Sequence, residues 1–381
     1  MKISIFLEAF EPEFWGGRET RWSRLIPEIA KAHEITIFGD FSSTKPTIAF
    51  PNVDCSFVNI GPLPNMYSSK GVRSLRHAFA YTWQCRSLLH HKADIILTDQ
   101  TPLIAVPILR AIAFLLKSDF SVTWHEIWSL ETWNKYSKKT GFIGVVLQTV
   151  ALISSKNIVL PSESVFMDLQ KKIFSKHAIV IPKGIDESVR TIAECGVATK
   201  SDTVKLLYVG RLIKHKNCDF LLQIMLLSVA EGKKWHLTIV GAGPMAIELA
   251  SSVRRLNLSH WVTLKSNLSK VELANHYGTS DVFVFPSERE GFGISVSEAL
   301  SNNLPAIVYN VPENAATKMI SSDLLGRKIN SLDPRSWMSA IDEILERDTE
   351  VKIGVFISGL LSWKIVGSQY LEFLNSIENR H

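Results

Sequence analysis

Short hydrophobic runs, rich in β-branched residues, alternate with longer stretches of helical periodicity along most of the chain. Such runs predict buried strands, and the stretches between them predict the helices that connect one parallel strand to the next. In the first half, the predicted strands are Lys2–Leu7, Glu34–Phe38, Asp94–Thr98, Ser121–Trp124 and Asn157–Leu160.

The pattern breaks near Ile179 and then starts again. The segment Ile179–Asp186 predicts a strand ending in a turn, and the polar stretch Glu187–Thr203 predicts a linker. A second alternating series follows, so the two halves of the chain repeat one architecture. Its predicted strands are Lys205–Val209, His236–Val240, Val262–Lys265, Val282–Phe285 and Pro305–Val308.

The helices of the second half are equally well marked. Asp333 is a predicted N-cap, followed by Pro334 at the first helical position. Ser362–Asn379 is amphipathic and predicts a terminal helix that could cross back to the first half. The other predicted helices are Cys218–Ala230, Pro244–Leu256, Lys270–Gly278, Gly293–Ser301 and Pro334–Arg347.

This pattern predicts an α/β protein with two Rossmann-like domains, residues 1–186 and 187–360, and a C-terminal helix, 361–381. Composition agrees with this prediction, because 381 residues with 46% hydrophobic and 21% charged side chains suit a globular protein that buries two cores. Ligands in such folds bind beyond the carboxyl ends of the strands.

The cysteines, the first residues and the most hydrophobic stretches of the chain indicate where in the cell the protein is expected. The four cysteines are far apart and form no C-x-x-C pair, which argues against a zinc site and favours a reducing compartment. The first residues lack the long apolar region of a secretory signal. Leu103–Leu116 and Gly141–Ile153 are the most hydrophobic helical stretches, and we expect both to be buried core helices. A cytoplasmic protein is therefore expected, with peripheral binding to the inner face of the membrane as an option.

The most distinctive motif is a pair of glutamates, Glu290 in a predicted loop and Glu298 in the helix that follows. Gly291 and Gly293 would let a ligand approach the backbone closely. The amides at the helix start can stabilise an anion, and Glu298 could accept hydrogen bonds from a sugar diol. A capped surface helix with ordinary acidic residues is the alternative, but the strand–loop–glycine–helix context favours a functional site.

A basic pair lies at the end of the first strand of the second half. Arg211 and Lys216 could together hold a pyrophosphate, which needs at least two fixed positive charges. A solvated basic loop is the alternative, and for this segment alone the two interpretations are about equal. The nearby turn Val240–Pro244 lacks the full G-x-G-x-x-G pattern, so a tight turn without a ligand is its favoured interpretation.

Two candidate sites fall in the first half. The Gly16-Gly17 turn follows the first strand, and its amides could meet a phosphate or a sugar; a plain turn is equally compatible. His125 follows a predicted strand, where it could hydrogen-bond a sugar hydroxyl. For a histidine considered alone, a buried core position is the better interpretation.

Taken together and in this order, the motifs resemble family 4 glycosyltransferases, which are retaining enzymes of the GT-B fold. The E-x7-E element is Glu290 to Glu298, the G-R-L-x-x-x-K element is Gly210–Lys216, and Ile181–Asp186 resembles the interdomain P-N-G-I-D. The resemblance covers nearly the whole chain. It implies two Rossmann-like domains facing each other across a deep cleft.

The resemblance also implies a role for each motif residue. Arg211 and Lys216 would bind the donor diphosphate, Glu298 the ribose hydroxyls, and Glu290 the transferred sugar. Lys265 would line the base pocket, and His125 would lie at the reaction centre. The implied catalytic residues are Glu290, His125, Arg211 and Lys216, and the implied donor-binding residues are Gly16, Gly17, Arg211, Lys216, Lys265, Gly291, Phe292, Gly293, Ile294 and Glu298.

Three positions depart from the family pattern. Lys183 replaces the asparagine of P-N-G-I-D, Asn303 replaces a frequent glycine, and Tyr309-Asn310 stands where a glycine pair is common. These departures affect the expected shape of the donor pocket more than the catalytic groups.

The resemblance implies a UDP-, GDP- or ADP-type sugar donor and no metal ion, and no Asp-x-Asp motif occurs in a predicted loop. The predicted function is transfer of a hexosyl or related sugar to a hydroxyl acceptor. A nucleotide-sugar epimerase of the same fold and a non-catalytic nucleotide-sugar-binding protein are the alternatives. The basic residues form no recognised nucleic-acid-binding motif, so nucleic acid is not an expected partner.

The acceptor is suggested by a basic amphipathic stretch, Gly71–Lys92, which could lie on anionic lipid. Lys135, Lys138 and Lys139, beside Trp133 and Tyr136, could add to it. These residues suggest a lipid-linked or cell-envelope glycan as acceptor, as in polysaccharide biosynthesis. A solvated helix on a soluble enzyme is the alternative.

Overall fold

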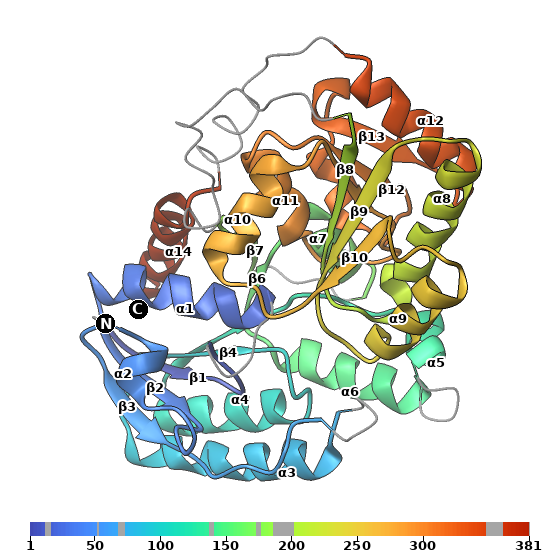
Figure 1. Cartoon of the computed structure of the whole chain (residues 1–381). Coiled ribbons are helices and arrows are strands. Elements are labelled where there is room, and N and C mark those ends of the chain that lie inside the picture. Colours follow the sequence, from blue (N-terminus) through green and yellow to red (C-terminus); the bar gives the residue numbers. More distant parts are fainter. Residues whose placement is uncertain are drawn as a thin grey trace. The chain divides into compact units, whose positions relative to one another are not determined.

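The computed structural model describes residues 1–11, 17–51, 53–67, 73–136, 141–172, 177–185, 202–347 and 361–380. The chain divides into two units (Figure 1). The first unit is Met1–Gly184 together with Trp363–His381, and the second is Ile185–Ser362. The last helix therefore belongs to the first unit.

The first unit is built on a seven-stranded sheet in which every pair of neighbours is parallel. Its order is β3-β2-β1-β4-β5-β6-β7. The sequence pattern did not predict β3, because this short edge strand is only partly buried and carries no continuous hydrophobic run. The strands are β1 Lys2–Phe6, β2 Glu34–Gly39, β3 Ser56–Asn59, β4 Ile95–Asp99, β5 Asp119–Thr123, β6 Asn157–Leu160 and β7 Ala178–Val180.

Helices cover both faces of this sheet. On one face, α1 and α14 share a core in which Trp22 and Tyr370 meet edge to face, 6.4 Å between ring centroids. On the other face, α3, α4, α6 and α7 contribute to a second core. The helices are α1 Gly17–Ala30, α2 Pro46–Ala49, α3 Leu75–Gln84, η1 Cys85–His90, α4 Ala105–Leu116, α5 Leu130–Tyr136, α6 Gly141–Ser154, α7 Glu163–Gln170 and α14 Trp363–Glu378.

The expectation that Leu103–Leu116 and Gly141–Ile153 are buried core helices is wrong. Both form helices, α4 and α6, but each is buried along one side only. Phe114 is 74% exposed and Phe142 is 71% exposed. Hydrophobicity all round a helix predicts burial all round only if other elements cover every side.

The second unit contains a six-stranded, wholly parallel sheet in the order β10-β9-β8-β11-β12-β13. Its strands follow the predicted runs to within one residue, apart from β13, which was not predicted. Gly326, Arg327 and Lys328 make β13 polar at this sheet edge. The strands are β8 Val204–Val209, β9 Trp235–Val240, β10 Val262–Lys265, β11 Val282–Phe285, β12 Ala306–Tyr309 and β13 Gly326–Ile329.

Two α-helices of the second unit, α10 and α12, begin at side-chain caps. Asp333 accepts a hydrogen bond from the amide of Ser336, as its predicted N-cap role requires. Ser269 and Glu272 form a capping box at the start of α10. The elements are η3 Lys214–Lys216, α8 Cys218–Ala230, α9 Ala246–Arg255, α10 Lys270–Thr279, α11 Ile294–Ser301, η4 Ala315–Met319, η5 Asp323–Leu325 and α12 Pro334–Leu345.

Each unit is thus a parallel sheet with connecting helices, and the predicted fold class of two Rossmann-like domains is confirmed. The carboxyl ends of parallel strands meet at one edge of each sheet. Most of the predicted functional residues lie at the ends of β5, β8, β10 and β11 or in the segments that come after these strands.

Candidate functional site

Lys216 and Glu290 contact each other in the second unit. They come from loops after β8 and β11, which are neighbours in the sheet. Lys216 Nζ donates to Glu290 Oε1 as an ion pair, and the two side chains are only 12% and 14% exposed. The Lys216 ammonium also lies 5.5 Å from the centroid of the Phe285 ring. Two residues predicted to act on the donor are therefore adjacent, in a partly desolvated position.

The Glu290 loop is held by Asn314, a buried residue that the sequence analysis did not single out. Asn314 Nδ2 donates to the carbonyl oxygens of Ser287 and Tyr309, at 3.0 and 2.9 Å. The Glu290 amide donates to the Glu313 carbonyl oxygen at 2.9 Å. Because amides and carbonyls on both segments are paired, the position of Glu290 is fixed by backbone as well as by its ion pair.

The start of α11 needs its glycine. Gly293 has φ of +95°, a conformation that side chains with a Cβ rarely adopt. A Cβ built on Gly293 would also lie 2.5 Å from Ala316 Cβ. Phe292 beside it is buried, which indicates a packing role, while Gly291 and Ile294 are partly exposed. The backbone at the predicted anion position is therefore shaped by close packing against η4.

Glu298 has a buried partner that the sequence did not reveal. Tyr277, in α10, donates its hydroxyl hydrogen to Glu298 Oε2 at 2.9 Å. Tyr277 is fully buried, and both this burial and the Glu298 charge raise the pKa of its phenol, so it remains a neutral donor. The carboxylate predicted to hold ribose hydroxyls is therefore oriented from inside the domain.

The glycine turn after β9 packs against the loop that carries Arg211. A Cβ on Gly241 would lie 1.9 Å from the Gly210 carbonyl oxygen, and one on Gly243 would lie 2.3 Å from that of Leu212. The Leu212 amide donates to Ala242 O at 2.9 Å. These contacts explain the glycines without a ligand, in agreement with the interpretation favoured from the sequence.

The remaining basic candidates of the second unit are exposed. Arg211 lies on the surface of the loop after β8, and Lys265 is exposed at the end of β10. The Lys265 Nζ lies 3.1 Å from His276 Nε2. Gly241 N donates to Lys265 O at 2.9 Å, which ties this strand end to the glycine turn.

Asn303 illustrates one departure from the family pattern. Its φ is +60°, in the left-handed region where glycine and asparagine are favoured. Asparagine can therefore replace the frequent glycine at this position without a change of backbone.

In the first unit, His125 pairs with Asp99, a second residue that the sequence analysis did not identify. His125 Nε2 and Asp99 Oδ1 are 2.9 Å apart, and both side chains are largely buried. Burial lowers the pKa of His125 and outweighs the opposing effect of the Asp99 charge, so the imidazole is neutral at pH 7. The His125 amide also donates to Gln100 Oε1 at 2.6 Å.

The buried carboxylate of Glu8, just beyond β1, contacts three basic side chains. Its Oε2 accepts from Arg73 at 2.6 Å and from Arg18 at 3.1 Å, and His77 Nε2 lies 3.4 Å from its Oε1. Burial alone would raise the pKa of Glu8, but the His77 hydrogen bond and the two guanidinium charges hold it well below the usual range. Arg73 and His77 were expected on a lipid-facing surface; their inward ion pairs with Glu8 contradict that placement.

The predicted residues are divided between the two units. Gly17, the first residue of α1, and His125 belong to the first unit, and the other described candidates belong to the second. Gly16, Lys138 and Lys139 lie outside the described residues, as do the side chains of Lys135 and Tyr136. Within the part of the chain that the structure describes, no group of three or more metal-ligating side chains is found, and metal independence stays a prediction.

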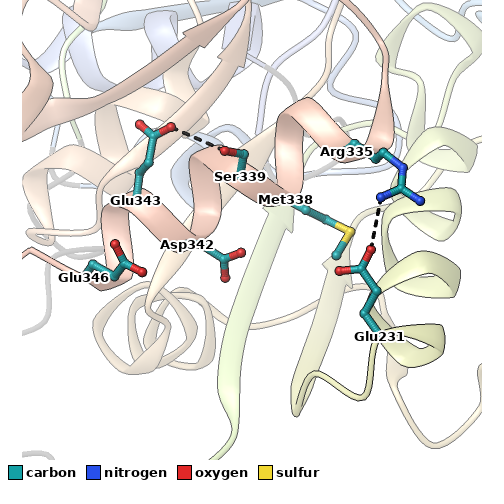
Figure 2. A pocket seen from close by; sticks show the side chains of 7 residues that line it. All are labelled: Glu231, Arg335, Met338, Ser339, Asp342, Glu343 and Glu346. Atoms are coloured by element: carbon teal, nitrogen blue, oxygen red, sulfur yellow. Dashed lines mark hydrogen bonds and ion pairs between the residues drawn. The ribbon is translucent and has the colours of Figure 1, made fainter.

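A surface pocket in the second unit is separate from these residues. It lies between α12 and the end of α8, where Arg335 reaches towards Glu231, 3.5 Å between Nη1 and Oε1 (Figure 2). None of the predicted site residues lines it. Its lining residues are Glu231, Arg335, Met338, Ser339, Asp342, Glu343 and Glu346.

Comparison with known sequences finds one family model, which matches within the second unit, and several related proteins. Residues 196–352 match the family model described as "Glycosyl transferases group 1". The O-antigen chain mannosyltransferase RfbU of Salmonella typhimurium is 33% identical over 144 residues, which cover 36% of this chain and 37% of that protein. The capsular polysaccharide biosynthesis glycosyltransferase CapH of Staphylococcus aureus is 27% identical over 229 residues, 58% of this chain and 61% of that protein. The chain thus matches between about a third and three fifths of the length of these relatives.

Solved structures match over the whole chain. Sucrose-phosphate synthase (tll1590) from Thermosynechococcus elongatus has a TM-score of 0.81 at 16% identity and covers 100% of both chains. Anabaena Alr3699/HepE in complex with UDP-glucose has a TM-score of 0.74 at 14% identity, covering 99% of this chain and 100% of that one. At these identities the likeness concerns the fold alone. The chain therefore has the two-domain fold of GT-B glycosyltransferases, and its second unit contains the region that matches the glycosyl transferases group 1 family.

Proposed function

We propose that this chain is a retaining glycosyltransferase that moves a hexosyl or related sugar from a nucleotide-diphosphate sugar to a hydroxyl acceptor. The contact between Lys216 and Glu290 carries the proposal. It brings a cation and a carboxylate together beyond the carboxyl ends of two adjacent parallel strands, where α/β folds bind their ligands.

Lys216 and Arg211 would hold the donor diphosphate. As the bond from the sugar C1 to the diphosphate oxygen breaks, negative charge develops on the leaving group, and a fixed ammonium stabilises that charge. In this scheme the protein's own cations perform the task that a divalent metal would otherwise perform.

Glu290 would orient the transferred sugar, and Glu298 would accept hydrogen bonds from the ribose. The acceptor oxygen attacks C1 on the face from which the diphosphate leaves, and a diphosphate oxygen takes the acceptor proton. His125, neutral at pH 7, would hydrogen-bond a sugar hydroxyl at the reaction centre. The configuration at C1 is then retained without a covalent glycosyl-enzyme.

The comparisons support the substrate classes of this proposal. Anabaena Alr3699/HepE was solved in complex with UDP and with UDP-glucose. RfbU is named for the O-antigen chain and CapH for capsular polysaccharide. We therefore infer a UDP-, GDP- or ADP-type donor and an envelope glycan or glycolipid acceptor, with the reaction in the cytoplasm.

The test compares Lys216→Met with Lys214→Met. Both lysines belong to η3, but Lys214 is exposed, whereas Lys216 contacts Glu290. Nucleotide diphosphates and their sugars are screened for thermal stabilisation of the wild type, because a ligand that binds the folded state raises its apparent stability. With the best donor, Lys216→Met should reduce kcat/KM on the order of 100-fold or more, as expected when a stabilising donor is removed from a transition state. Lys214→Met should behave as the wild type.

Other outcomes separate the competing functions. Wild-type rates for Lys216→Met would contradict the diphosphate assignment. A free sugar or epimer formed from the donor alone would identify an epimerase, and donor binding without turnover on any glycan acceptor would identify a binding protein. A glycosyl adduct on Glu290, detected by mass spectrometry, would replace the proposed mechanism with a covalent one.

A further inference from the structure

In the first unit, α3, η1, α4 and α6 form one continuous layer. α4 contacts α3, η1 and α6, and all four elements pack onto the same face of the sheet. Their inner sides are fully buried, with Tyr81, Leu109 and Leu152 in the core. Their outer sides together make the α3–α4–α6 surface, defined as the exposed side chains of these four elements.

The α3–α4–α6 surface is strongly hydrophobic. More than half of the exposed large hydrophobic side chains among the described residues lie on it, although these elements are a small part of the chain. On α6 they run the length of the helix, from Phe142, 71% exposed, to Ile153, also 71% exposed. Phe79 and Trp83 on α3 and Phe114 on α4 add aromatic rings. Apolar surface on this scale marks an interaction site.

The same surface has charge of one sign only. No Asp or Glu occurs in residues 73–92, 102–118 or 141–156. Arg76 and Arg86 are exposed there, and Lys117 is exposed directly after the end of α4. The Arg86 guanidinium lies 4.6 Å from the centroid of the Trp83 ring. Arg73 and His77 do not count among these cations, because both engage Glu8. Within these four elements, the surface thus combines apolar side chains with positive charges and carries no carboxylate; the exposed Glu131 lies on α5, which packs against α6.

We propose that the α3–α4–α6 surface binds the headgroup region of an anionic phospholipid bilayer. Aromatic and aliphatic side chains enter the boundary between headgroups and acyl chains, and basic side chains pair with lipid phosphates. A second copy of this chain fits less well, because a symmetric contact would place these cations opposite one another without an acidic partner.

The surface lies on the bilayer and does not cross it. A 14-residue helix such as α6 is about 21 Å long, shorter than the roughly 30 Å hydrocarbon core. No helix among the described residues is long and apolar enough to span a membrane. The proposal deepens the proposed function, on which it rests for one point, the lipid-linked acceptor. This surface is connected along the chain to the proposed reaction centre, because α4 follows β4, and the last residue of β4 is Asp99, the partner of His125.

Flotation of the full-length protein with lipid vesicles tests the proposal. The wild type should bind phosphatidylglycerol vesicles at least about tenfold more tightly than phosphatidylcholine vesicles. The reason is that each basic side chain near an anionic surface makes the free energy of binding more favourable. Added salt should weaken this binding. The double variant Phe142→Glu/Ile153→Glu should lose about tenfold or more of the affinity, because its two new carboxylates face the anionic lipid.

The matched control is Ile247→Glu on α9, since Ile247 is 83% exposed but belongs to the second unit. It should bind vesicles as the wild type does. Thermal stabilisation by nucleotide diphosphates is measured on every variant. This readout shows that each variant is folded, and it keeps the two proposals distinguishable, because nucleotide binding requires no vesicle and vesicle binding requires no nucleotide.

Three outcomes would overturn the proposal. The first is absence of binding to phosphatidylglycerol vesicles at low salt. The second is equal binding by the wild type and the Phe142→Glu/Ile153→Glu variant. The third is a wild-type dimer, seen by light scattering, that this variant abolishes while vesicle binding is weak, which would assign the surface to a second copy of the chain.

Discussion

The phenol of Tyr277 donates a hydrogen bond to Glu298 across 2.9 Å, from one helix of the second unit to the next. Tyr277 is fully buried and lies 5.9 Å from Phe283, between ring centroids, so its hydroxyl has little freedom to move. Glu298 is partly exposed. The carboxylate is therefore anchored from the core by this hydrogen bond.

Tyr277→Phe should weaken binding of ligands that contain ribose by about tenfold, because a hydrogen bond to a charged group is lost. Calorimetry with UDP and with inorganic pyrophosphate checks this, since only UDP carries the ribose. Tyr370→Phe is the matched control, a buried tyrosine of the first unit. Equal weakening of UDP and pyrophosphate binding would indicate general damage to the domain and contradict a role through Glu298.

Asp99→Asn should move the titration of His125 to lower pH. The Asp99 charge favours the protonated imidazole, so its removal leaves burial, which lowers the pKa of His125, less opposed. Histidine resonances followed by NMR as a function of pH measure this shift. Asp94→Asn alters an exposed residue just before the same strand and should leave the titration unchanged. An unchanged or higher pKa of His125 in Asp99→Asn would refute the electrostatic coupling.

Glu8→Gln should lower the free energy of unfolding of the first unit by about 3 kcal/mol at pH 7, since it removes the buried negative charge that Arg18, Arg73 and His77 share. The pKa of Glu8 is lowered from its usual value of 4.5, so the carboxylate stabilises the fold fully above that pH. This stabilisation is lost as the pH falls from there towards the folded-state pKa. The difference between wild type and variant should therefore shrink in acid.

Denaturant unfolding at several pH values measures this difference. Glu34→Gln provides the control, because Glu34 is exposed and its ion pair with Lys2 spans 3.6 Å. Such surface pairs contribute roughly 1 kcal/mol or less. A pH-independent difference for Glu8→Gln would mean that the ionised carboxylate is not the source of the stabilisation.

Gly241→Ala should destabilise the second unit by about 3 kcal/mol, because the added methyl group would lie 1.9 Å from the Gly210 carbonyl oxygen. Gly232→Ala is the comparison. Gly232 has φ of +73°, so alanine at this position introduces backbone strain of roughly 1 kcal/mol, but nothing lies within 4 Å of the added methyl group. Chemical denaturation gives both values. Equal losses would show that the loop around Gly210 moves freely away from the turn.

Hydrophobic periodicity determined most of the fold. The runs at Asn157–Leu160, Val262–Lys265 and Val282–Phe285 are strands with those bounds, and Cys218–Ala230 is a helix with those bounds. Such signals are local, because the pattern of buried and exposed positions follows directly from the geometry of a strand or a helix. The edge strands β3 and β13 lack that pattern and were found only in the structure.

The sequence also determined which residue types follow β8 and β11, and so indicated Lys216 and Glu290 as separate candidate site residues, without predicting their contact. Only the tertiary structure decided their partners. Asp99 and Tyr277 lie 26 and 21 residues from the side chains they contact, and no local pattern encodes such pairs.

The tertiary structure also decided which side chains are exposed to water. The sequence of α6 is hydrophobic on all sides, which predicts burial, yet the layer of α3, α4 and α6 leaves Phe142 and Ile153 uncovered. The sequence pattern predicted that Arg73 and His77 would lie on the surface as cations, but in the structure both side chains contact Glu8. A side chain's hydrophobicity is fixed by the sequence, but its contact with water depends on which elements pack over it, and that is settled only when the whole domain folds.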